Sequence, residues 1–154
     1  MRDRGEAGFT FLEIILVVGI IAVAATLVAP AIDSGMRARE VRTAVRGLAG
    51  TLRTLHSDAV ISGHVQRLVI DPHANELRVV ERDATVSLGE ATQLTTVRGG
   101  ERDPSGLIRV NFYPNGSTSG VDVVIDDRET PGDMGFLVRL DPLIGLITIE
   151  DEPR

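Results

Sequence analysis

Three patterns of apolar and polar positions follow one another along the chain. Residues 14–32 contain no charged side chain. Beyond them, apolar residues alternate in spacing between four and three, which defines one narrow helical stripe; these residues are Val41, Val45, Leu48, Leu52, Leu55 and Ala59. From residue 63 onward the period changes to two, as in β-strands. The order predicts an α+β fold in which a long N-terminal helix packs, through its stripe, on an antiparallel β-sheet domain of one or two sheets.

Turn-forming residues divide the C-terminal segment into three predicted hairpins. Their strand pairs are 65–70 with 77–80, 108–112 with 121–125, and 136–140 with 146–149. One or two further strands are expected near Val86 and Leu94, with a loop at 99–106.

The uncharged N-terminal stretch is a candidate transmembrane helix. At about 1.5 Å per residue, residues 14–32 nearly span a hydrocarbon core of about 30 Å. A cleaved secretory signal is the alternative, because Ala22-Val23-Ala24 is typical of a small-residue cleavage site. However, the first eight residues carry two acids against two arginines, and Glu13 stands at the edge of the apolar stretch. A charged side chain at mid-bilayer costs about 2.5 to 3.5 kcal/mol, so Glu13 requires a partner and a purpose.

Charge excludes one class of function and leaves others open. The net charge is −6, and all sixteen basic residues are arginine. Residues 63–154 carry 16 acids and 9 arginines, so this segment would repel phosphate backbones and nucleic-acid binding is not expected. Cysteine is absent, which excludes disulfides and thiol chemistry.

No pattern of catalytic or metal-binding residues is recognisable, so we expect no enzyme, cofactor or metal. His56, His64 and His73 lack metal-site spacing, and His56 and His73 are expected in solvent on a helix and in a turn. Residues 116–120 are expected to form a hairpin loop. Residues 126–133 offer acids that could gather around calcium, but their spacing matches no calcium loop and favours a solvated acidic loop.

The sequence Gly8-Phe9-Thr10-Phe11-Leu12-Glu13, followed directly by the apolar run, resembles the processing site of type IV pilins and type II secretion pseudopilins. The resemblance implies that a prepilin peptidase cuts between Gly8 and Phe9 and methylates the new amine. That amine would lie four positions before Glu13, on the same helix face, so the two charges can neutralise each other between subunits and set their register. Pro30 is expected to kink the helix, as prolines in this region do in the family.

Motifs in the C-terminal segment are similar to those of H-type minor pseudopilins, the GspH/FimT family. They are Phe112-Tyr113-Pro114-Asn115-Gly116-Ser117 with Gly120, and Leu140-Asp141-Pro142-Leu143-Ile144-Gly145. The resemblance implies four segments: a leader at 1–8, a transmembrane helix segment at 9–32, an amphipathic helix at 33–62 and a β-rich periplasmic domain at 63–154.

The function that this resemblance implies is a non-catalytic subunit of the periplasmic pseudopilus in type II secretion. Its partners would be other pseudopilins, the prepilin peptidase and inner-membrane lipid. The N-terminus is expected in the cytoplasm. This orientation is contrary to the positive-inside rule, because five arginines follow the apolar run and only two precede it. Three alternatives stay open: a minor pilin of a type IV pilus, a Sec-exported periplasmic binding protein or hydrolase, and an anchored domain without processing.

Overall fold

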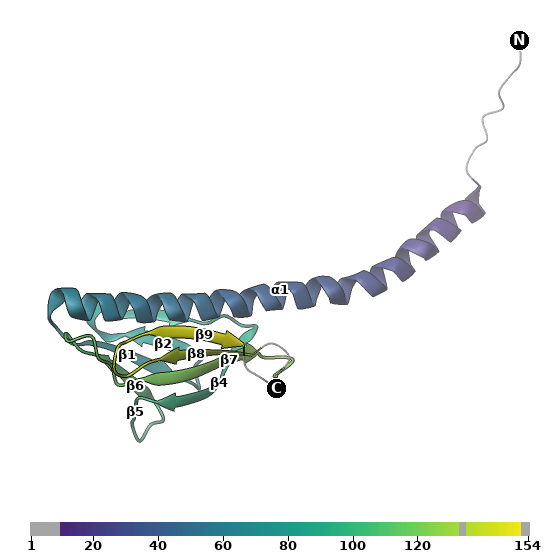
Figure 1. Cartoon of the computed structure of the whole chain (residues 1–154). Coiled ribbons are helices and arrows are strands. Elements are labelled where there is room, and N and C mark those ends of the chain that lie inside the picture. The colour runs from purple at the N-terminus through teal and green to yellow at the C-terminus, as the bar shows by residue number, and fades with distance from the viewer. Residues whose placement is uncertain (1–9, 133–134, 152–154) are drawn as a thin grey trace, which may run out of the picture. The chain divides into compact units, whose positions relative to one another are not determined.

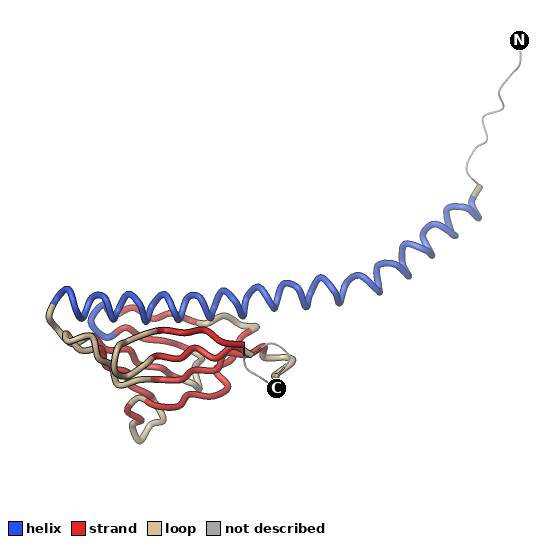
Figure 2. Tube along the Cα trace, in the orientation of Figure 1, coloured by secondary structure: helices blue, strands red, loops and turns tan. Residues whose placement is uncertain are grey.

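The computed structural model describes residues 10–132 and 135–151, and for 27–34 the backbone alone. The leader 1–8 and Phe9 lie outside the described residues. The chain divides into two units, residues 1–36 and 37–154. Within the described residues, a single helix, α1 (Phe11–Ser62), is followed only by strands and one short 3-10 turn (Figure 2), so the predicted α+β fold is confirmed.

The strands of the second unit form two antiparallel sheets, as Figure 1 shows. The first sheet has the order β3-β2-β1-β6-β5 and the second the order β4-β7-β8-β9. The strands of the first are β1 (Gln66–Asp71), β2 (Glu76–Val79), β3 (Ala84–Ser87), β5 (Glu101–Arg102) and β6 (Ile108–Phe112). Those of the second are β4 (Thr92–Gly99), β7 (Val121–Asp127), β8 (Phe136–Leu140) and β9 (Ile147–Asp151). The 3-10 turn η1 (Val80–Arg82) separates β2 from β3.

Residues 37–62 of α1 run along these sheets, and the predicted stripe is the buried face of that segment (Figure 1). All six stripe residues are buried, with exposures between 0% and 2%. They share one core with inward residues of both sheets, among them Leu68, Val110 and Val138. Burying a leucine or valine contributes about 1.5 to 3 kcal/mol, so the stripe fixes the helix against both sheets.

The first and third predicted hairpins are confirmed. In the first, Leu68 pairs with Val79 and Asp71 with Glu76. In the third, Val138 pairs with Ile149. Strands also form near Val86 and Leu94 as expected, and the predicted loop at 99–106 contains the two-residue strand β5.

The second predicted hairpin is wrong, because β6 and β7 belong to different sheets. β6 pairs with β1 and β5, whereas β7 pairs with β4 and β8. The loop between them begins as a tight turn, in which the Tyr113 N–H donates to the Ser117 carbonyl at 2.9 Å. The Thr118 N–H then donates to the Pro142 carbonyl in the β8–β9 turn at 2.8 Å, which carries the chain to the second sheet. Alternation shows which residues of a strand are buried, but not which strand lies beside it.

Candidate functional site

Residues 14–25 of α1 form an unbroken apolar surface, which Phe11 and Leu12 continue on the other side of Glu13. Every one of these residues is exposed in the single chain. Phe11 is 80% and Leu12 77% exposed, and Ile20 and Val23 exceed 60%. Soluble monomers rarely expose an apolar patch of more than a few hundred Å², so this surface is built to be covered by something else. Within the part of the chain that is described, no helix is both long and apolar enough to cross a membrane.

Glu13 stands at the beginning of this surface, in the first turn of α1. Its side chain is exposed, and its backbone N–H donates to the Thr10 hydroxyl at 3.2 Å. Thr10 therefore caps the helix, and Glu13 occupies the third helical position, as in a capping box. The spacing Thr-x-x-Glu is visible in the sequence, but its capping role was not predicted. Of the other predicted site residues, Gly8 and Phe9 lie outside the described residues.

Pro30 lies within α1, whose backbone is helical without interruption from Phe11 to Ser62. Its side chain is outside the described part, and the kink expected at Pro30 stays a prediction.

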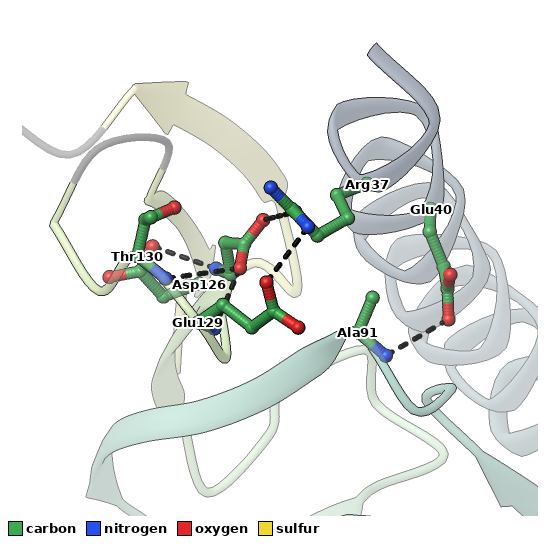
Figure 3. Close-up of polar contacts among 7 residues, drawn as sticks. Arg37, Glu40, Ala91, Asp126, Glu129 and Thr130 are labelled. Atoms are coloured by element: carbon green, nitrogen blue, oxygen red, sulfur yellow. Dashed lines mark hydrogen bonds and ion pairs between the residues drawn. The ribbon is translucent and has the colours of Figure 1, made fainter. Parts of the chain in front are cut away.

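The segment of α1 that begins the second unit is joined to the β7–β8 loop by ionic contacts (Figure 3). The Arg37 guanidinium donates to Glu129 Oε2 at 2.8 Å, and its Nε lies 3.5 Å from Asp127 Oδ2. The Asp127 side chain is 1% exposed and that of Arg37 is 23% exposed. Because a buried carboxylate without a cation is costly, this pair fixes where the helix meets the sheet.

Glu40 forms a second polar contact one turn further along α1. Its Oε1 accepts a hydrogen bond from the Ala91 N–H at 3.2 Å, as Figure 3 shows. Gly89 permits this approach, because a Cβ at that position would lie 2.4 Å from the same oxygen. The helix is thus anchored both to the β7–β8 loop and to the segment that enters β4.

The solvated acidic loop predicted at 126–133 is wrong for its first two residues. Asp126 and Asp127 are 2% and 1% exposed. Asp127 Oδ1 accepts hydrogen bonds from the Glu129 and Thr130 N–H groups, and Asp126 Oδ2 accepts one from the Gly132 N–H. These carboxylates are buried because they satisfy loop N–H groups and Arg37. In the described residues, no group of three or more His, Cys, Asp or Glu side chains could hold a metal ion; Asp133 lies outside them.

His56 is half-buried rather than solvated, which corrects the sequence prediction. Its Nε2 lies 2.9 Å from the Gly116 carbonyl oxygen, so the helix contacts the β6–β7 loop. Gly145 packs against the same ring, since a Cβ there would lie 2.2 Å from Nε2. His73 is exposed in the β1–β2 turn, as predicted, and His64 is also exposed, just after α1. Of the three histidines, His56 alone joins distant parts of the domain through its ring.

Asn75 joins the two sheets, a role that sequence reasoning missed. It lies in the β1–β2 turn with a φ of 58°, and its side chain is buried. Its Nδ2 donates to the Thr92 and Gly89 carbonyls, and its Oδ1 accepts from the Leu94 N–H at 3.1 Å. A turn-forming asparagine was evident from the sequence, but its long-range partners at residues 89–94 were not.

Among the residues that the structure describes, Glu81 and Asp103 have a lowered pKa, and hydrogen bonds within the domain are the cause. Burial would raise the pKa of Glu81, but hydrogen bonds from the Arg67 guanidinium and N–H, each at 2.8 Å, outweigh burial and lower it. Hydrogen bonds from Ser105 and Leu107 lower the pKa of Asp103 in the loop before β6. Neither group belongs to the exposed surface of α1.

Known proteins resemble this chain both in sequence and in fold. No family model matches the chain. The chain is 30% identical over 149 residues to the type II secretion system protein H of Xanthomonas campestris pv. campestris, covering 91% of this chain and 86% of that relative.

Two solved structures share the fold. The minor pseudopilin EpsH from the type 2 secretion system of Vibrio cholerae has a TM-score of 0.59 at 17% identity, covering 73% of this chain and 97% of that one. The type IV minor pilin FimU of Pseudomonas aeruginosa has a TM-score of 0.50 at 15% identity, covering 73% and 92%.

An exposed apolar N-terminal helix that continues into a helix packed on antiparallel sheets defines a pilin-like subunit. The two solved structures show the same fold at low sequence identity. This chain belongs to the type II secretion system protein H family. Its role is therefore that of a minor pseudopilin, and the H-type resemblance found in the sequence is confirmed.

Proposed function

We propose that this minor pseudopilin is cut between Gly8 and Phe9, held in the inner membrane by residues 9–32, and then drawn into a periplasmic pseudopilus that serves protein export. The N-terminus would face the cytoplasm and the second unit the periplasm. The subunit would act by assembly and not by catalysis. Its partners would be other pseudopilins, the prepilin peptidase before assembly, and inner-membrane lipid.

The observation that carries this proposal is the exposure of residues 14–25, in which no polar side chain interrupts the apolar surface. Lipid can cover such a surface before assembly, and the helices of neighbouring subunits can cover it afterwards. Because both environments are apolar, transfer between them changes little in hydrophobic free energy. The helix can therefore leave the membrane if polar contacts between subunits favour the filament.

Glu13 supplies such a contact. In lipid its charge costs about 2.5 to 3.5 kcal/mol at mid-bilayer. Cleavage after Gly8 would create a cationic amine at Phe9, and the amine of one subunit can meet Glu13 of the next in the filament core. An axial slip would leave both charges unpaired in a low dielectric, so the pair selects a single register.

The relative from Xanthomonas is named for type II secretion, which favours that system over a type IV pilus. The capping contact with Thr10 gives Glu13 a second, purely local role, and the experiment must separate the two roles.

The test replaces Glu13 in the full chain and follows both processing and assembly in the native host. Glu13→Gln keeps a polar side chain suited to the capping box but removes the charge, whereas Glu13→Asp keeps the charge. We expect Glu13→Gln to be cleaved normally but to lose co-purification with other pseudopilins and to reduce secretion at least tenfold, with Glu13→Asp intermediate. Thr10→Ala removes the cap alone and should assemble at close to the wild-type level. Normal assembly of Glu13→Gln would refute the charge-pairing role.

A further inference from the structure

Four arginines line the side of α1 that faces away from the sheets in the second unit. They are Arg39, Arg42, Arg46 and Arg53, and all four are exposed. Within the described part of the chain none of these guanidinium groups has a carboxylate partner, whereas Arg37, Arg67 and Arg82 each pair with an acid. We call these four residues the arginine stripe.

The stripe occupies one narrow strip of the helix. With 3.6 residues per turn, its members fall within about 60° around the axis, and they extend about 21 Å along it. Like charges three or four residues apart, as in Arg39, Arg42 and Arg46, destabilise an isolated helix by about 0.2 to 0.5 kcal/mol per pair. The acids of this helix segment offer no relief, because Glu40 contacts Ala91 and Asp58 pairs with Arg82. Repulsion between these arginines therefore destabilises the helix of the single subunit, and an acidic partner would reduce this repulsion.

Two glycines beside the arginine stripe also indicate that another surface lies against the helix here. At Gly47 and Gly50, an added Cβ would meet nothing within 4 Å, so packing within this chain does not require glycine there. Glycine in a helix interior costs about 0.5 to 1 kcal/mol relative to alanine. A neighbour's surface that approaches the helix closely at this point would explain the choice.

We propose that the arginine stripe docks on carboxylates of a neighbouring pseudopilin's globular domain, an inference that rests on the assembly function proposed above. This chain's own domain shows the complementary chemistry, since residues 63–154 carry 16 acids against 9 arginines, and a neighbouring domain of like composition would offer carboxylates to the stripe. A basic helix face on one subunit and an acidic domain on the next form a head-to-side contact, which repeats along a filament without closing.

A lipid surface fits the stripe less well. Each headgroup layer is about 5 to 7 Å thick, so it would contact only part of a stripe about 21 Å long unless the helix lay flat on the membrane. A row of carboxylates on a protein domain can match the whole length.

The chain offers an unusual probe, because it contains no lysine. Arg42→Lys or Arg46→Lys each adds one side-chain primary amine and keeps the charge. A carbodiimide joins amines to carboxylates without a spacer, so treatment of cells that make the full chain should cross-link each variant to another pseudopilin through a Glu or Asp that mass spectrometry identifies. Arg78→Lys, exposed on β2, is the matched control and should cross-link at least fivefold less.

Charge reversal tests whether the contact contributes to assembly. We expect Arg42→Glu combined with Arg46→Glu to lower co-purification with other pseudopilins at least tenfold, while Arg42→Lys with Arg46→Lys retains it. Both double variants should fold with an unchanged urea midpoint, because the wild-type side chains have no acidic partner in the described chain.

Three results would overturn the proposal. One is assembly of the charge-reversed chain at the wild-type level. Another is the absence of a protein cross-link from Arg42→Lys and Arg46→Lys subunits that have assembled. The second result is what a membrane partner would give, since phosphatidylglycerol offers a phosphate and not a carboxylate. If the unaltered chain itself does not co-purify with other pseudopilins, the proposed assembly function fails and the stripe's role fails with it.

Discussion

Replacing Asn75 by glycine tests whether one amide holds the two sheets together. Glycine accepts the φ of 58° at this position without strain, so the substitution removes the side-chain hydrogen bonds and leaves the turn geometry intact. The three bonds lost are those to the Thr92 and Gly89 carbonyls and from the Leu94 N–H.

The expected loss follows from these bonds. Each contributes about 1 kcal/mol net, and a buried N–H left without a partner, here that of Leu94, costs about 1 to 3 kcal/mol. Allowing for water that enters the gap, the free energy of unfolding should fall by about 3 kcal/mol. This is a large share of the 5 to 15 kcal/mol that is typical of domains.

The chain provides its own optical probe for this experiment. It has one tyrosine and no tryptophan, so the fluorescence of Tyr113, in the β6–β7 loop, reports the second unit alone. In urea, with a slope of about 1.5 kcal/mol per molar, the midpoint of the full chain in detergent should fall by about 2 M. Asn115→Gly, at an exposed turn, measures the cost of adding a glycine together with the loss of two exposed, short-range hydrogen bonds from Ser117. A midpoint for Asn75→Gly within about 0.5 M of that control would refute the role of the amide.

Three further substitutions test other contacts by the same unfolding assay. Asp127→Asn removes the charge that faces Arg37 and should cost about 2 to 3 kcal/mol; a loss below about 0.5 kcal/mol would contradict the ionic anchor. Gly145→Ala brings a Cβ against the His56 ring at a φ of +65° and should cost about 1 to 3 kcal/mol, part of which His56→Ala should restore; an unchanged midpoint would show that the ring moves freely. Glu81→Gln should cost about 0.5 to 1 kcal/mol at pH 7, because this partly exposed carboxylate has a lowered pKa. A lowered pKa stabilises the fold above the unfolded value of about 4.3 and loses this effect as the pH falls through the folded value, so the difference between wild type and Glu81→Gln should shrink steadily as the pH falls below about 4.3; a difference that stays undiminished in acid would contradict the ionic origin.

Patterns that depend on near neighbours in the sequence were read correctly. The stripe from Val41 to Ala59 is the buried helix face, and the turns at 71–76 and 141–145 join the strands that they were expected to join. In each case the signal and the structure involve residues only a few positions apart. Helical period and turn chemistry suffice for such predictions.

Features that depend on distant residues could not be predicted. β6 has clean alternation, yet its partner is β1, some forty residues earlier, and not the next strand. Asp127 was expected in solvent because its neighbours are polar, but Arg37 lies ninety residues away and accompanies it into a buried site. Asn75 likewise acts on residues of the other sheet. Long-range pairing of this kind follows from the packing of the whole domain.

Glu13 combines a contact with a near neighbour in the sequence and a proposed contact with a distant group. Its local contact with Thr10 follows from a spacing of three residues and needs no partner subunit. Its proposed partner is the amine of another chain, which is created only by cleavage after Gly8. The sequence therefore gives the charge and its position on the helix, whereas the pairing depends on assembly.

The most direct measurement of the central claim is the mass of the N-terminal peptide of this protein, purified from the membranes of its own host in complex with other pseudopilins. The account predicts a chain that begins at Phe9 with a methylated amine. A chain in that complex that begins at Met1 would contradict it, because Glu13 would then lack the amine at Phe9, and a chain that begins near Thr26 would show that the apolar helix is a discarded export signal.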